Sequence, residues 1–219
     1  MTETAAQPTR RRFAAMIGGV LLVLAASGIL MGIITGEALY PAAYTTHDNE
    51  ISDLGATRPP DSIILQPSAT IFNITMIVAG IAIMAGAWLT YLGHRSRRAL
   101  ISVGLLGFGA LGVGVFPGNN PGFHPLFALL TFASGGIAAV LVAPMLAAPF
   151  RYVSVGLGVT SLASLGFGTF GTGTKLFEEL GDGGVERWVA YPIILWMVTY
   201  GGYLAGRYAP PEGDTETPR

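Results

Sequence analysis

Six long apolar stretches, separated by shorter polar segments, dominate the chain. They cover residues 13–35, 68–93, 99–116, 123–150, 152–170 and 185–207. A helix needs about 20 mainly apolar residues to cross the hydrocarbon core of a bilayer. The pattern therefore predicts an all-α integral membrane protein, a six-transmembrane-helix bundle that forms a single domain over residues 13–207.

Basic residues mark one side of the predicted bundle. They flank the apolar stretches at alternate ends: Arg10, Arg11, Arg12, Arg95, Arg97, Arg98, Arg151 and Arg207. The opposite loops hold only Arg58, Lys175 and Arg187. Lys and Arg accumulate in cytoplasmic loops, so we expect both termini in the cytoplasm and the protein in the cell membrane. The first stretch is too long for a signal peptide. Residues 1–12 and 208–219 are predicted to be cytoplasmic tails, and disorder is expected for residues 1–9 and 208–219.

Composition agrees with a chain that mostly avoids water. Only 11% of the residues are charged, 51% are hydrophobic and the mean hydropathy is +0.56, whereas soluble domains carry about 25% charged residues. The net charge of −1 gives no reason to expect nucleic acid as a partner. There are no cysteines, which excludes disulfides, thiolate metal sites and cysteine nucleophiles.

Glycine is abundant, with 31 residues, and it recurs inside the stretches 99–116 and 152–170. Small residues let transmembrane helices approach closely. Two interpretations stay open from the sequence: these glycines pack helices together, or they line a groove for a lipid chain.

Polar residues with possible chemistry gather on the side opposite the basic loops. Asp53, His124 and Glu186 are candidates for a catalytic acid–base group or a metal-binding group. Glu50, Ser52 and Asn73 are candidates for polar support. Each also has a plain structural interpretation, since Glu186, for instance, complements the positive end of a helix dipole. No known catalytic or phosphate-binding motif is present, so the sequence leaves cofactor and metal unknown.

Several short motifs carry a family resemblance. In chain order they are Asn49-Glu50-Ile51-Ser52-Asp53-Leu54-Gly55, Phe72-Asn73, Phe116-Pro117 followed by His124, Glu186-Arg187-Trp188, and Tyr191-Pro192. Together they resemble the six-span prokaryotic family known as domain of unknown function 998. The chain is more distantly similar to the eukaryotic DRAM/Frag/Sfk membrane proteins, although Arg187 separates a Glu–Trp pair that is adjacent there. The distant resemblance implies a lipid-related role.

Three functional hypotheses follow. The first is a lipid-handling or lipid-modifying protein with a polar site at the outer leaflet, whose partners are membrane lipids. The second is a non-catalytic membrane protein, such as a sensor, assembly factor or partner-binding subunit, in which the same motifs hold loops in place. The third is a transporter, and it ranks last because the stretches lack internal repeats and mid-span charges.

Overall fold

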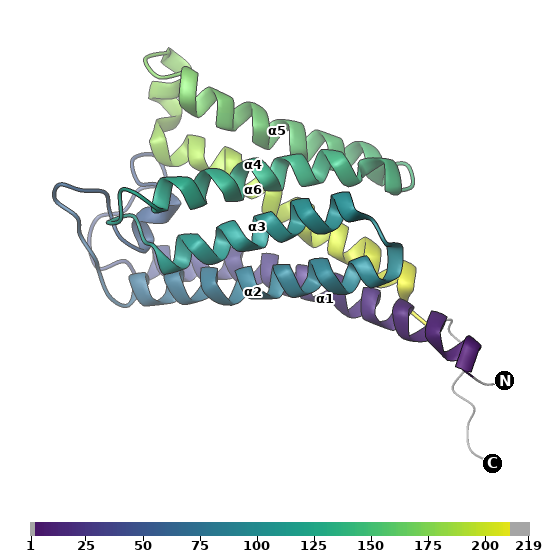
Figure 1. The fold of residues 1–219 in the computed structure, drawn as a ribbon. Helices are drawn as coiled ribbons and strands as arrows, with labels where there is room; N and C mark the ends of the chain where they lie inside the picture. Colours follow the sequence, from purple (N-terminus) through teal and green to yellow (C-terminus); the bar gives the residue numbers. More distant parts are fainter. Residues whose placement is uncertain (1–2, 211–219) are drawn as a thin grey trace.

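A computed structural model describes residues 3–210, with side chains from Thr9 onward, and all regular secondary structure in this part of the chain is helical (Figure 1). Six of its helices are long and apolar enough to cross a membrane. They are α1 (Glu3–Ala38), α2 (Ser68–His94), α3 (Arg97–Val115), α4 (His124–Val142), α5 (Phe150–Phe170) and α6 (Lys175–Tyr208). Two 3₁₀ turns, η1 (Ile51–Leu54) and η2 (Ala143–Met145), complete the structure. The predicted six-helix membrane fold is confirmed.

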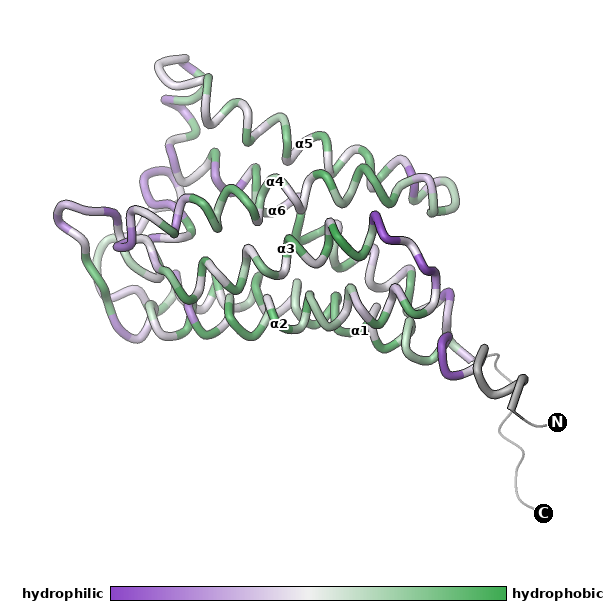
Figure 2. Tube along the Cα trace, in the orientation of Figure 1, coloured by the Kyte–Doolittle hydropathy of each residue, from purple (hydrophilic) through white to green (hydrophobic). Residues whose placement is uncertain are grey.

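The helices run alternately up and down, so that the bundle has two distinct ends (Figure 1). The first turns of α1 and the last turn of α6 lie at one end, which we call the terminal end. The segments 39–67, 116–123 and 171–174 lie at the other, the loop end. Each helix contacts the next in sequence, and α6 also packs against α1, which closes the bundle. Figure 2 shows hydrophobic residues along the helices and hydrophilic residues gathered at both ends.

The two glycine-rich helices differ in how they pack. In α3, a Cβ at Gly107 would lie 2.8 Å from the Gly80 carbonyl oxygen of α2, so backbones meet there. In α5, Gly156 and Gly166 have no heavy atom within 4 Å of where a Cβ would stand. α5 is also the least buried of the six helices. Close packing therefore accounts for the α3 glycines except Gly104, which faces open space, and for Gly158 of α5, whereas much of α5 is left open.

Three boundaries differ from those expected from the sequence. The apolar stretch 123–150 contains Pro144, which cannot continue an α-helix, and α4 accordingly ends at Val142. α6 begins at Lys175, ten residues before the predicted start, because its first turns are polar and escape a hydropathy pattern. α1 begins at Glu3, inside the tail expected to be disordered, since arginines favour helix. Residues 211–219 of the other predicted tail lie outside the described residues.

Candidate functional site

Arg187, in α6, anchors the loop of residues 39–67 to the helices. Its side chain is only 8% exposed, and its guanidinium donates five hydrogen bonds to oxygen atoms of α1, the loop and α6. The acceptors are Glu37 Oε1 (2.5 Å), Tyr44 Oη (2.9 Å), Thr46 O (3.3 Å), Asn49 O (2.9 Å) and Gly183 O (2.8 Å). The loop therefore has a defined course across the start of α6.

A break in α6 brings the helix backbone against this loop. Gly181 has φ +69°, in the left-handed region, and a Cβ there would lie 2.1 Å from the His47 carbonyl oxygen. Two residues later, the Gly183 N–H donates to that same carbonyl at 2.9 Å. His47 adds a side-chain link, with Nε2 3.0 Å from the Glu178 carbonyl and Nδ1 2.6 Å from Asp48. These bonds raise the pKa of His47.

Glu186 caps the 3₁₀ turn η1 from a distance of 135 residues in sequence. One of its carboxylate oxygens accepts the Ile51 backbone N–H, the first donor of that turn. The first N–H groups of a helix lack intrahelical acceptors, so an acidic side chain there both completes a hydrogen bond and complements the local dipole. The contact holds Ser52 next to Glu186.

Glu50 and Asp53 flank the same turn but differ in surroundings. Glu50 is mostly buried and accepts two contacts from Arg58 Nη2, at 2.5 and 2.6 Å. Burial raises the pKa of Glu50, although Arg58 opposes the shift. Asp53 turns back to accept the Glu50 N–H at 3.0 Å, and burial raises the pKa of Asp53 as well.

His124 begins α4 and is buried. Its Nδ1 lies 2.8 Å from the Phe116 carbonyl oxygen. A carbonyl can only accept, so in the neutral imidazole Nδ1 carries the proton and Nε2 keeps a lone pair. Within the described residues no hydrogen bond engages Nε2. The ring is thus held in the tautomer that can accept a proton from a bound molecule.

A pocket of about 430 Å³ joins several of these groups at the loop end. Its polar lining residues come from the loop, α4, α5 and α6: Glu50, Ser52, Arg58, His124, Thr169, Asp182 and Glu186. Its other lining residues come from the loop, the segment 116–123, α4, α5 and α6, and include Ala128, Phe132, Leu165, Phe177, Val185 and Val189. The pocket lies where α5 diverges from α4 toward the loop end (Figure 1). Its lining thus combines polar and apolar side chains.

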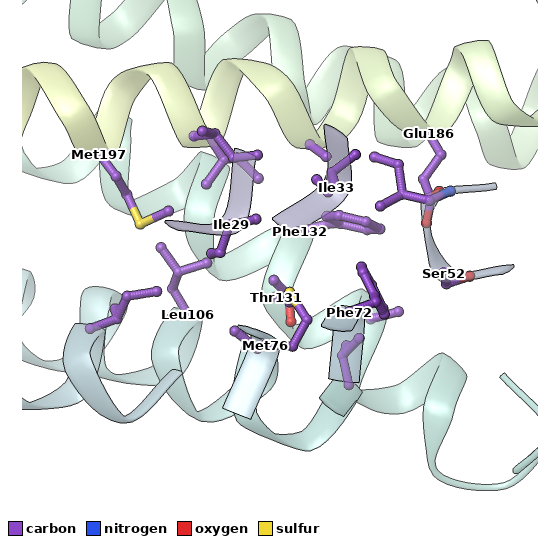
Figure 3. Close-up of a pocket in the computed structure, with 18 of the residues that line it drawn as sticks. Ile29, Ile33, Ser52, Phe72, Met76, Leu106, Thr131, Phe132, Glu186 and Met197 are labelled. Atoms are coloured by element: carbon purple, nitrogen blue, oxygen red, sulfur yellow. The ribbon is translucent and has the colours of Figure 1, made fainter. Parts of the chain in front are cut away.

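Below this pocket, a second and narrower cavity of about 60 Å³ continues into the bundle (Figure 3). Ser52, His124 and Glu186 line both spaces. The rest of the narrow cavity is lined almost wholly by apolar side chains. The polar groups thus stand between a wide outer pocket and a narrow apolar one.

The structure brings four of the six candidate residues to one pocket, namely Glu50, Ser52, His124 and Glu186. Asp53 does not line it and instead accepts the hydrogen bond from Glu50. Asn73 lies apart on α2, where its amide oxygen faces Gly55 and has no hydrogen-bond partner within residues 9–210.

Sequence reasoning missed Arg58, Asp182 and, above all, Arg187 as members of this region. In the sequence, Arg187 is one of few basic residues on its side and part of the Glu186-Arg187-Trp188 motif, and neither observation predicts a structural role for it. The sequence feature that could have identified it is its position just inside an apolar stretch, where a charged side chain requires a partner. Nothing in the sequence identified Glu37 as that partner. Among the described side chains, no group of three or more His, Asp or Glu is placed to hold a metal ion.

Comparison with known proteins gives one match. A family model described as protein of unknown function (DUF998) matches residues 23–203, which include all six helices in whole or in part. No curated protein and no solved structure matches the chain.

Proposed function

Because the chain belongs to the DUF998 family, whose function is unknown, we propose from its geometry that it binds a membrane lipid with the headgroup in the pocket at the loop end. One observation carries the proposal. The pocket is lined both by carboxyl, hydroxyl and imidazole groups and by apolar side chains of α4, α5 and α6. A molecule that fits such a lining has a polar part and an apolar part, as a lipid has.

The charge of the lining favours a headgroup that donates hydrogen bonds or carries positive charge. Three carboxyl groups line the pocket, from Glu50, Asp182 and Glu186. Arg58 is the guanidinium among the lining residues, and it is paired with Glu50. An ammonium or hydroxyl group of a lipid would find acceptors in the carboxyl groups of Asp182 and Glu186. An anionic group would be repelled by their charge.

The same site supports acid–base chemistry on the bound headgroup. His124 Nε2 would accept the proton of a headgroup hydroxyl or of a water molecule, with Phe116 fixing the tautomer. The protonated imidazole would then be stabilised by the nearby acidic groups. If the deprotonated oxygen attacked an ester carbonyl of the bound lipid, the imidazolium could return the proton to the leaving alcohol oxygen, and the protein would then modify the lipid as well as bind it.

We further propose that the loop end faces outward from the cell membrane. Four basic residues lie at the terminal end, in or next to the connections from α2 to α3 and from α4 to α5: Arg95, Arg97, Arg98 and Arg151. Such residues favour the cytoplasm. The pocket would then meet lipids of the outer leaflet, laterally, where α5 diverges from α4.

Two variants test the lipid site. Glu186→Gln keeps an oxygen that can accept the Ile51 N–H but removes the acid, and His124→Ala removes the base. Both should reduce lipid that copurifies with the protein, as measured by native mass spectrometry, and should change the membrane lipids of cells. Thr199→Ala, an exposed position near the other end of α6, is the control. Unchanged lipid in both variants, at normal protein levels, would refute the proposal.

One set of contacts favours the second candidate, a non-catalytic membrane protein. Glu186 and Arg187 are both engaged in holding the loop to α6, which is a sufficient structural role. On this alternative, Glu186→Ala and Asp53→Ala lower thermal stability while Glu186→Gln does not, and none of the three changes a lipid. Loss of lipid in the stable Glu186→Gln variant would exclude it.

A further inference from the structure

Arg58 brings a positive charge with unengaged donors into the lining of the pocket at the loop end. Its side chain is 68% exposed, and a single nitrogen, Nη2, donates to both carboxylate oxygens of Glu50. A guanidinium carries five N–H donors. Within residues 9–210 no hydrogen bond engages Nε or Nη1 of Arg58. The pair with Glu50 therefore leaves the donors of two nitrogens available.

Backbone contacts hold Arg58 in this position. The Thr57 N–H donates to the Ile63 carbonyl oxygen at 3.0 Å, and the Ile63 N–H donates to Thr57 Oγ1 at 2.7 Å. These two bonds close the segment between them. On the preceding side, Gly118 packs so closely that a Cβ there would collide with the Ala56 carbonyl oxygen. The guanidinium is thus carried on a backbone whose course is fixed on both sides.

Carboxylates in the same lining bring negative charge. Asp182 is exposed, and its side chain makes no hydrogen bond or ion pair within the part of the chain whose side chains are described. Glu186 accepts the Ile51 N–H through one oxygen and has a second oxygen left. Asp182 also contributes to the raised pKa of Glu50, because nearby like charge opposes ionisation. Available groups of opposite charge therefore lie in one pocket.

The pocket has room for a headgroup that carries both charges. Its volume of about 430 Å³ falls within the range of about 300–1,000 Å³ that small-molecule sites show. A purely cationic headgroup would leave the free donors of Arg58 unused. A purely anionic headgroup would be repelled by Asp182 and Glu186. A zwitterionic headgroup satisfies both kinds of group at once.

We propose that the pocket recognises a phosphoethanolamine group, with the phosphate on Arg58 and the ammonium on Asp182 and Glu186. Arg binds phosphate through paired N–H donors. A primary ammonium has three N–H donors, and the carboxylates supply acceptors for them. A quaternary ammonium has no N–H and is recognised by aromatic cages. The lining holds Phe132 and Phe177 but neither Trp nor Tyr among the described residues, which favours the primary amine.

The inference rests on the proposed lipid site and names the headgroup that this site takes. Binding to the purified full chain is measured by native mass spectrometry with four probes. Three share one acyl chain: lysophosphatidylethanolamine, lysophosphatidylcholine and monoacylglycerol, which lacks the phosphate. The fourth, glycerophosphoethanolamine, has no acyl chain and tests for a soluble ligand. Lysophosphatidylethanolamine should bind about tenfold more tightly than each of the others, the equivalent of about one charge-assisted hydrogen bond.

Variants of the two charged groups test their separate roles. Arg58→Gln should weaken lysophosphatidylethanolamine about tenfold and leave monoacylglycerol unaffected, which a merely destabilised protein would not do. Arg58→Lys keeps a charge for Glu50 but lacks the paired donors, so it should restore only part of the binding. Asp182→Asn should reduce the preference for lysophosphatidylethanolamine over lysophosphatidylcholine. Arg97→Gln and Asp61→Asn, at exposed positions outside the pocket, are the matched controls and should change neither.

The outcomes separate the headgroup from the lipid site. If wild-type protein binds lysophosphatidylethanolamine no more tightly than the other two lipids, while His124→Ala weakens all three, the headgroup assignment is overturned and the lipid site stands. Unchanged binding in Arg58→Gln would overturn the role of Arg58 and with it the assignment. Wild-type protein that binds none of the four probes would overturn both proposals. Glycerophosphoethanolamine bound as tightly as the lysolipid would support the recognised group and overturn a lipid as its source.

Discussion

At the scale of single residues, Arg187 connects the loop with α1 and α6 through the five hydrogen bonds of its guanidinium. A guanidinium is costly to bury unless its donors are satisfied, and here four of its five N–H directions are met by Glu37, Tyr44 and backbone carbonyls. Tyr44 also lies under the guanidinium, with the Arg187 Cζ 5.8 Å from the ring centre. The planar fork of Arg suits this many acceptors, and the single ammonium of Lys does not.

Arg187→Met should therefore destabilise the protein by about 3–5 kcal/mol, since it leaves the Glu37 carboxylate and several carbonyls without their donor. Thermal unfolding in detergent measures the loss. Arg97→Met, at an exposed position of α3, is the control and should change little. Equal unfolding temperatures for the two variants would contradict this role.

His47 gives the loop a pH dependence of known sign. Both ring nitrogens face acceptors, the Asp48 carboxylate and the Glu178 carbonyl, and Asp182 adds nearby negative charge. Only the protonated ring can donate to both. The pKa of His47 is raised, so its stabilisation is complete below about pH 6.5 and is lost as the pH rises through the folded value.

Amide hydrogens of residues 45–50 should accordingly lose protection as the pH rises above about 6.5, after correction for intrinsic exchange. Hydrogen–deuterium exchange with mass spectrometry measures this. In His47→Gln the protection should be lower and independent of pH over the same range. A wild-type loop with constant protection would rule out His47 as the titrating link.

At the scale of the elements, the break at Gly181 decides how α6 meets the loop. The residues before it form a polar turn, and those after it form the membrane-spanning helix. Hydropathy located the second part and missed the first, since Glu178, Glu179 and Asp182 interrupt the apolar pattern. The left-handed φ at Gly181 is a property of one residue in its three-dimensional context, and no periodicity in the sequence reports it.

Gly181→Ala should destabilise the protein, because the backbone at Gly181 (φ 69°, ψ 171°) lies in a region open almost only to glycine, where another residue costs about 1–3 kcal/mol, and because the new Cβ would collide with His47. Gly184→Ala is a matched control three residues on. Its Cβ would meet the nearest atom at 3.4 Å, so it should stabilise the helix by about 0.5–1 kcal/mol. Thermal unfolding separates the two, and a shift in the same direction for both would refute the explanation.

At the scale of the whole molecule, the six spans were predictable because each is long enough and apolar enough on its own. The site was predictable only in part. Glu50, Ser52, His124 and Glu186 were identified as polar residues on one side, and they do line one pocket. The course of the loop was not predictable from the sequence, because it depends on contacts such as that of Arg187 with Asn49, between residues 138 apart in sequence. Asp53 is likewise placed by such local geometry.

Because the chain has no cysteine, its orientation can be tested with single introduced thiols. Asp61→Cys lies exposed at the loop end and Arg97→Cys lies exposed at the terminal end. A membrane-impermeant maleimide added to intact cells should label the first and spare the second, and both should react once the membrane is permeabilised. Labelling of position 97 alone in intact cells would mean that the bundle is inverted.

The link between Arg187 and Glu37 also has a consequence for how the protein is made. Glu37 and the loop leave the ribosome long before α6, because synthesis proceeds from the N-terminus. The carboxylate of α1 receives its counter-ion only when the last helix has been inserted. A chain cut short before α6 therefore presents an uncompensated charge within a membrane helix and an untethered loop. The ion pair between Arg187 and Glu37 can therefore form only in a chain that includes α6, and chains truncated before α6 lack it.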